Sequence, residues 1–175
     1  MGESLTLRPI AHIYTDFKEK FGIPRQSGIA ETRGVIVFEP EYSVAEAFRG
    51  IEEYSHLWIL WQFSEAVRED WSPTVRPPRL GGNKRMGVFA TRSPYRPNSI
   101  GLSSVKLIGL SSYEGRIALE VEGADLLDGT PIYDIKPYLP YADSKPDAKG
   151  SYAEEHRDHA LEVVFPEDLL QKLPE

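Results

Sequence analysis

The sequence predicts a mainly β protein, folded as one compact β-barrel or β-sandwich with minor helices. Short runs rich in β-branched and aromatic residues recur along the chain, whereas helical spacing of apolar residues is rare. The 14 glycines and 14 prolines cluster between these runs instead of spreading evenly. Many short strands joined by turns are typical of all-β barrels and sandwiches.

Eight runs have the composition of strands. Within residues 116–121 apolar side chains occupy alternate positions, as a half-buried strand requires, and residues 111–115 before it predict a hairpin loop. The expected strands cover residues 6–14, 34–38, 57–63, 87–91, 102–110, 116–121, 132–135 and 161–165.

Two helices are expected. Ser43 can cap a helix over residues 44–54, whose apolar side chains share one face. Pro166 and the two acids after it are a typical helix start, so residues 166–172 form the second expected helix.

Length and composition narrow the class of protein. A chain of 175 residues is enough for one domain with a core and short for two, so we expect a single domain over residues 1–175. No apolar run approaches the ~18 residues of a membrane helix, and the first residues lack a secretory pattern. The absence of cysteine excludes disulfides, thiolate metal sites and cysteine nucleophiles. We expect a cytoplasmic protein.

Positive charge is concentrated in one part of an acidic chain. The net charge is −7, from 20 basic and 27 acidic residues, yet residues 71–113 contain seven basic residues and no acidic one. The rest of the chain therefore carries 13 − 27 = −14. Such a segregated charge predicts an anion-binding face, because the local field attracts phosphates more than the total charge does. A solvated loop that lacks acids by chance is the alternative.

Three segments combine polar residues with glycine or proline beside apolar runs. In residues 21–26, Pro24 restrains the backbone, while Arg25 and Gln26 supply a cation and an amide. In residues 76–102, two arginines flank Tyr95, an aromatic ring able to stack on a base. An ordinary surface turn and a proline-braced solvated loop are the alternatives for these two segments.

The third segment covers residues 125–141. It begins with a turn at residues 128–131, after which Asp134, Lys136 and Tyr138 alternate with apolar residues. A carboxylate, an ammonium and a phenol on one face form a possible wall of a polar site. The alternative is an edge strand with a satisfied Asp–Lys pair.

Metal and nucleotide-binding motifs are weak or missing. His156 and His159 offer at most two ligands in a charged turn, so we expect no metal. No phosphate-binding glycine loop and no dinucleotide-binding motif occurs in the sequence.

At these segments the sequence resembles the TsaA/TrmO family of tRNA methyltransferases. The resemblance covers roughly residues 7–152 and rests on several long words in the same order. They are Phe-Gly-Ile-Pro-Arg-Gln at 21–26, Ser-His-Leu-Trp-Ile-Leu at 55–60, Arg-Pro-Pro-Arg-Leu-Gly-Gly at 76–82, Gly-Val-Phe-Ala-Thr-Arg-Ser-Pro at 87–94, Arg-Pro-Asn at 96–98, Ile-Gly-Leu at 100–102, Asp-Gly-Thr-Pro at 128–131 and Asp-Ile-Lys-Pro-Tyr-Leu-Pro at 134–140.

The resemblance implies a small barrel without a Rossmann fold that binds S-adenosylmethionine and forms a homodimer. It implies methylation of N6 of N6-threonylcarbamoyladenosine beside the anticodon of threonine tRNA. Many bacterial members continue into a C-terminal domain, which we expect to be absent from this chain.

The resemblance also assigns residues. The implied cofactor contacts are Pro24, Arg25, Gln26, Ser64, Glu65, Arg92, Leu102, Asp128, Gly129, Thr130 and Pro131.

Asp134 and Tyr138 are candidates for steering the acceptor proton, with Lys136 fixing their charge. The expected phosphate contacts in the basic segment are Arg76, Arg79, Lys84, Arg85 and Arg96. A non-catalytic S-adenosylmethionine- or RNA-binding module is the alternative function.

Overall fold

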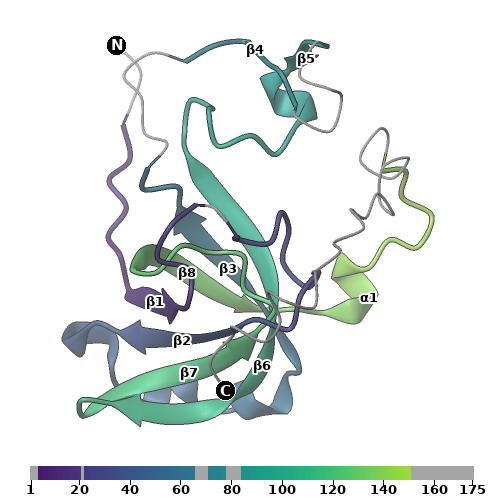
Figure 1. Cartoon of the computed structure of the whole chain (residues 1–175). Helices are drawn as coiled ribbons and strands as arrows, with labels where there is room; N and C mark the ends of the chain where they lie inside the picture. The colour runs from purple at the N-terminus through teal and green to yellow at the C-terminus, as the bar shows by residue number, and fades with distance from the viewer. Residues whose placement is uncertain (1–3, 21, 66–70, 78–83, 151–175) are drawn as a thin grey trace, which may run out of the picture.

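The structure, a computed structural model, describes residues 4–20, 22–65, 71–77 and 84–150 (Figure 1). Its strands are β1 (Ala11–Thr15), β2 (Arg33–Phe38), β3 (His56–Gln62), β4 (Thr74–Val75), β5 (Met86–Gly87), β6 (Ile100–Tyr113), β7 (Arg116–Glu122) and β8 (Thr130–Pro137). Its short helices are η1 (Pro40–Tyr42), η2 (Ala45–Phe48), η3 (Ile51–Glu53), η5 (Val88–Ala90) and α1 (Pro140–Asp143). The prediction of a mainly β protein with minor helices is confirmed.

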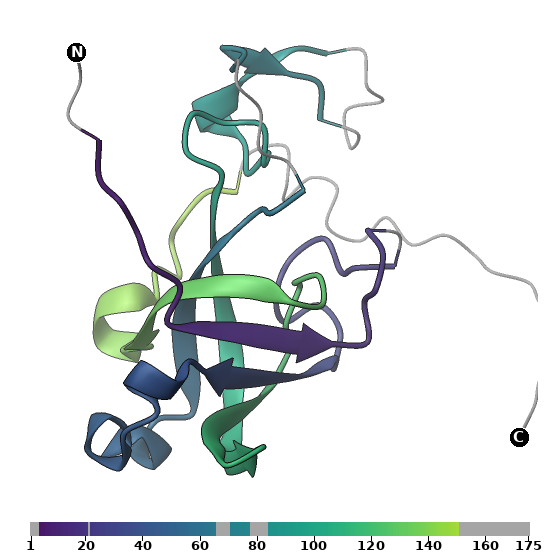
Figure 2. The ribbon, with the colours of Figure 1, turned by 90° about the vertical axis from the view of Figure 1, so that its left-hand side faces the viewer.

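The strands β1-β2-β7-β6-β3-β8 follow one another around a closed barrel in which every neighbouring pair is antiparallel. β8 pairs with β3 on one side and with β1 on the other, which closes the ring. β4 and β5 form a separate two-stranded sheet beyond one end of the barrel (Figures 1 and 2). No helix of the described part is long and apolar enough to span a membrane.

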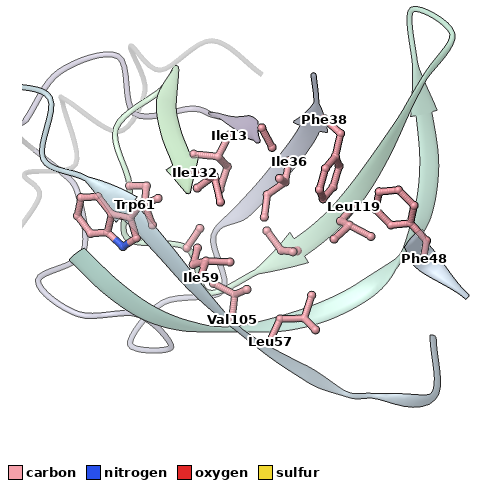
Figure 3. Close-up of a cluster of buried hydrophobic side chains, with 14 residues drawn as sticks. Ile13, Ile36, Phe38, Phe48, Leu57, Ile59, Trp61, Val105, Leu119 and Ile132 are labelled. Carbon is pink, nitrogen blue, oxygen red and sulfur yellow. The ribbon is translucent and has the colours of Figure 1, made fainter. Parts of the chain in front are cut away.

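The interior of the barrel is filled by apolar side chains from alternate strand positions (Figure 3). Ile13, Ile36, Ile59, Leu119 and Ile132 come from five different strands, and none is exposed to solvent. Complete burial of such side chains contributes about 1.5–3 kcal/mol each to the folded state. The core therefore fixes which face of each strand is turned outward.

A β-bulge in β8 changes that face part-way along the strand. Leu60 of β3 pairs with Asp134, whereas its neighbour Trp61 pairs with Ile132, so Tyr133 is the additional residue. Because of this shift, Ile132 and Ile135 both pack against the core although three positions separate them. The side chain that packs on the core after the bulge is at an odd-numbered position, whereas the buried side chains before it are at even-numbered positions.

Trp61 lies against a glycine at the end of the barrel. A Cβ atom on Gly101, its partner on β6, would lie 2.2 Å from the indole. The indole N–H donates a hydrogen bond of 3.0 Å to Ser103 Oγ, also on β6. The indole can therefore lie flat on β6 only because position 101 has no side chain.

Two expected elements have a different form. The helix predicted over residues 44–54 is two 3₁₀ helices, η2 and η3, because Gly50 between them has a φ of 85° and interrupts the helical path. The prediction of a strand over residues 87–91 is wrong. Only Met86 and Gly87 pair with β4, and the chain then turns through η5, which buries Val88.

The remaining expectations differ mainly at their ends. The strand expected from residue 6 begins at Ala11, and the predicted hairpin loop is a two-residue turn at Glu114 and Gly115, with φ of 49° and 78°. Positive φ at both positions matches the twist of a two-residue hairpin. The strand and helix expected over residues 161–165 and 166–172 lie outside the described residues.

Replacing Gly101→Ala should destabilise the protein by about 1–3 kcal/mol, since the new Cβ must displace the Trp61 ring from β6. Urea unfolding followed by circular dichroism measures this change. Gly109→Ala, also in β6, is the matched control because a Cβ there meets no atom within 4 Å. Equal destabilisation by both substitutions would contradict the proposed steric role of Gly101.

Candidate functional site

A cavity of about 660 Å³ opens at the end of the barrel where β3 ends and β6 and β8 begin. Its volume lies within the range of small-molecule and cofactor sites, and it is lined by aromatic, apolar and charged side chains. Five stretches contribute lining residues. They are residues 23–26, 61–65, 91–98, 100–103 and 125–130.

The cavity brings two of the predicted cofactor segments together. Pro24, Arg25 and Gln26 line it from one loop, and Arg92 lines it from another. The Arg92 guanidinium donates a hydrogen bond to the side-chain oxygen of Gln26, which holds the two loops in contact. Arg92 and Arg25 place two guanidinium groups where they can bind a carboxylate or another anion.

The loop that carries Arg92 is braced by its own polar groups. Arg96, predicted as a phosphate contact, lines the cavity instead of standing free, and its guanidinium donates to the carbonyl oxygens of Thr91 and Ser93 at 3.1 and 3.3 Å. The Ser99 hydroxyl donates to the carbonyl of Pro94 at 3.1 Å. These bonds pre-form the loop, which lowers the entropy lost on binding a ligand.

A partly buried carboxylate that sequence reasoning missed also lines the cavity. Asp125 accepts a hydrogen bond of 2.6 Å from the Ser103 hydroxyl, whose oxygen in turn accepts the Trp61 indole N–H. Burial raises the pKa of the Asp125 carboxyl, and hydrogen bonds from Ser103 and from backbone N–H groups, with the charge of Arg92, oppose that rise. The available signal was one acidic residue between the apolar residues Ala124 and Leu126.

Other predicted cofactor residues lie at the rim. Ser64 and Glu65 line the cavity just after β3, and Glu65 forms a 2.9 Å ion pair with Lys20. Leu102 also lines it and is 55% exposed, which is unusual for a large apolar side chain in a strand. Tyr95 lines the same cavity from the braced loop.

The turn at residues 128–131 contributes fewer residues to the cavity than the resemblance implies. Thr130 lines the cavity, whereas Asp128, Gly129 and Pro131 are not among its lining residues. The Asp128 carboxylate accepts from Lys18 Nζ at 2.6 Å and from the backbone N–H of Thr15 at 2.9 Å, and these bonds lower its pKa. Its contacts therefore hold the turn against the end of β1.

The predicted proton-steering residues are placed outside the cavity. Asp134 and Lys136 follow the bulge on the outer face of β8 and form an ion pair of 2.9 Å. The Tyr138 ring lies 5.5 Å from the ring of Trp58, a lining residue, so it approaches the cavity through that side chain. The expected sharing of one face by Asp134 and Lys136 is present.

The other described residues that are predicted to contact phosphates lie around the small β4–β5 sheet. Arg76, Lys84 and Arg85 are exposed there, and Arg85 donates a long hydrogen bond of 3.5 Å to Thr74 Oγ1. Arg79, another predicted phosphate contact, lies outside the described residues. In the described ranges no group of three or more His, Asp or Glu side chains could hold a metal ion.

Comparison with known proteins identifies the family. The family "tRNA-methyltransferase O N-terminal domain" matches residues 12–144. The chain belongs to this family. It is 46% identical over 171 residues to the tRNA (adenine(37)-N6)-methyltransferase of Escherichia coli, covering 97% of this chain and 73% of that protein.

Two further relatives agree with this assignment. A protein of Pseudomonas aeruginosa named as a putative S-adenosylmethionine-dependent methyltransferase is 48% identical over 152 residues, covering 86% of this chain and 62% of that one. The crystal structure of TrmO from P. aeruginosa has a TM-score of 0.71 at 41% identity, covering 86% of this chain and 63% of that chain. The chain thus spans less than two thirds of both P. aeruginosa proteins.

The residues of the cavity fit S-adenosylmethionine. This cofactor carries a carboxylate, which suits Arg25 and Arg92, and positive charge, which suits the partly buried carboxylate of Asp125. Its adenine can pack on an aromatic ring, and Tyr95 and Phe63 both line the cavity. When bound, it would supply the methyl group for transfer.

The raised pKa of Asp125 predicts a pH dependence of stability. Between the ordinary and the raised pKa the folded state binds more protons than the unfolded state, so this group's contribution to stability grows as the pH falls. Wild-type protein should therefore gain stability relative to Asp125→Asn on acidification. Urea unfolding of both proteins over a pH series tests this, since the other titrating groups cancel in the difference. A relative loss of stability in acid would contradict the burial of this carboxylate.

Proposed function

We propose that this chain transfers a methyl group from S-adenosylmethionine to N6 of adenine 37 in tRNA. The observation that carries the proposal is its 46% identity to the E. coli enzyme of that name, together with a cavity built from the motif segments. We further propose that the acceptor is N6-threonylcarbamoyladenosine in threonine tRNA. The whole reaction would take place in the cytoplasm.

The protein's contribution to this reaction is mainly positioning. Arg25 and Arg92 would hold the carboxylate of the cofactor, and the hydrogen bond between Arg92 and Gln26 keeps these loops in place before binding. Holding the nucleophile, methyl carbon and sulfur in line removes most of the entropy barrier of a two-substrate reaction. The assignment of proton-steering roles to Asp134, Lys136 and Tyr138 stays a prediction.

The proposal includes contacts to tRNA and to a second copy of the chain. Arg76, Lys84 and Arg85, exposed on the small sheet, would bind phosphates of the tRNA backbone. A homodimer is supported by a row of exposed apolar side chains along β6. These side chains are Ile100, Leu102, Ile108 and Leu110.

Incubation of the protein with S-adenosylmethionine and threonine tRNA carrying N6-threonylcarbamoyladenosine should add one methyl group to that nucleoside. Mass spectrometry of the digested tRNA measures the product. Unmodified threonine tRNA is the control, since it lacks the proposed acceptor group. Cofactor binding without methylation of any tRNA would instead support a non-catalytic binding module.

Lys84→Ala and Arg85→Ala should weaken tRNA binding and reduce the slope of log affinity against log salt by about one unit each, because each removes one phosphate contact. Their S-adenosylmethionine affinity should stay unchanged, as neither residue lines the cavity. Arg92→Ala should instead lower the affinity for S-adenosylmethionine and leave the salt slope of tRNA binding unchanged. Fluorescence titrations with tRNA at several salt concentrations, and calorimetry with the cofactor, measure both. If neither Lys84→Ala nor Arg85→Ala alters the affinity for tRNA, the small sheet does not bind tRNA.

A further inference from the structure

The Asp125 carboxylate has a different environment from the other acid of the cavity. Among the described residues that line the cavity, Glu65 and Asp125 are acidic. Glu65 is half-exposed and paired with Lys20 at 2.9 Å. No ion pair of the described residues includes Asp125, whose nearest influence of opposite charge is the field of Arg92. Its negative charge is therefore partly buried, and among the described residues no ion pair includes it.

Fixed donors already occupy most of the hydrogen-bonding capacity of this carboxylate. The Ser103 hydroxyl donates to it at 2.6 Å, and the backbone N–H groups of Ser27 and of Asp125 itself also stabilise it. The Trp61 indole donates to the oxygen of Ser103, which leaves the hydroxyl proton pointing to Asp125. A ligand with N–H donors would compete with these donors, whereas a cation without N–H groups needs only the negative potential.

Two aromatic rings line the same cavity as this carboxylate. The Trp61 and Phe63 rings are 4.2 Å apart at 57°, and both line the cavity. Weakly hydrated cations without N–H donors are stabilised by aromatic faces as well as by anions. A partly buried carboxylate with its donors in place, in a cavity that two aromatic rings also line, is therefore complementary to a soft, poorly hydrated cation.

We propose that Asp125 faces the sulfonium group of S-adenosylmethionine and makes the site prefer this cofactor to its uncharged product, S-adenosylhomocysteine. The inference rests on the proposed function. In that reaction the bond between methyl carbon and sulfur breaks, its electron pair stays on sulfur, and the N6 proton passes to solvent as the new carbon–nitrogen bond forms. Sulfur thereby loses its positive charge, so the attraction to Asp125 disappears and the product is released more readily.

Calorimetry with S-adenosylmethionine and S-adenosylhomocysteine tests the inference on wild-type protein and on Asp125→Asn, which keeps the shape of the side chain. The substitution should lower the affinity for S-adenosylmethionine by roughly 10–100-fold, the size expected for a charge pair at intermediate effective dielectric. The affinity for S-adenosylhomocysteine should change far less. Glu65→Gln is the matched control, since it removes a carboxylate that already has a lysine partner and should change both affinities alike.

The wild-type protein provides a second measurement that needs no substitution at Asp125. Its preference for S-adenosylmethionine should fall as the pH is lowered through the raised pKa of Asp125, and Glu65→Gln should show the same fall. Glu65 is the other acidic side chain that lines the cavity among the described residues. The basic side chains that line it are Lys20, Arg25, Arg92 and Arg96.

Three results would overturn the inference. An unchanged preference in Asp125→Asn and across the pH series would show that Asp125 serves the fold or a group common to both ligands. An equal loss of preference in Glu65→Gln would assign discrimination to the total charge of the cavity. Failure of wild-type protein to bind either ligand would overturn the proposed cofactor, and this inference with it.

Discussion

The contact between Trp61 and the bare backbone of Gly101 is the constraint on which the rest of the site depends. With a side chain at position 101 the indole could not lie on β6, and its N–H could not reach Ser103. Ser103 in turn directs its proton to Asp125, so the core of the barrel orients the carboxylate of the cavity. The β8 bulge lies opposite the same tryptophan, which pairs with Ile132 beyond the shift in register. The packing of the barrel end and the orientation of the cavity carboxylate therefore both depend on the Trp61–Gly101 pair.

Opposite charges share this cavity without cancelling one another. Arg92 donates to Gln26 and only influences Asp125 through its field, so the guanidinium and the carboxylate remain separate binding features. Removing the Asp125 carboxylate from water disfavours its charged form and raises its pKa. A ligand with both an anionic and a cationic group can satisfy each feature at its own end. The arrangement thus selects a zwitterionic ligand with an additional positive charge more strongly than a simple anion.

The sequence predicted the elements whose signal is local and missed those that depend on tertiary contacts. Runs of β-branched and aromatic residues located β2 and β3, and alternating apolar residues located β7. Residues 87–91 have strand-like composition, but the chain turns through η5 there and buries Val88. The motif resemblance assigned several segments that the structure brings around one cavity. It did not reveal Asp125, since the local signal of this residue, one acid between two apolar residues, does not show that the carboxylate accepts from a serine of β6.

The acid-free segment of residues 71–113 combines two uses of positive charge that the sequence could not separate. Lys84 and Arg85 lie exposed at the small sheet, while Arg92 and Arg96 are engaged at the cavity by Gln26 and by backbone carbonyls. Since η5 and the braced loop join these places directly, the two groups of cations belong to one continuous stretch of chain. A polyanion held by the exposed group would lie next to a cofactor held by the engaged group. The loop that carries Arg92 and Arg96 is already fixed by its own hydrogen bonds, which lowers the entropy lost when the two reactants are brought together.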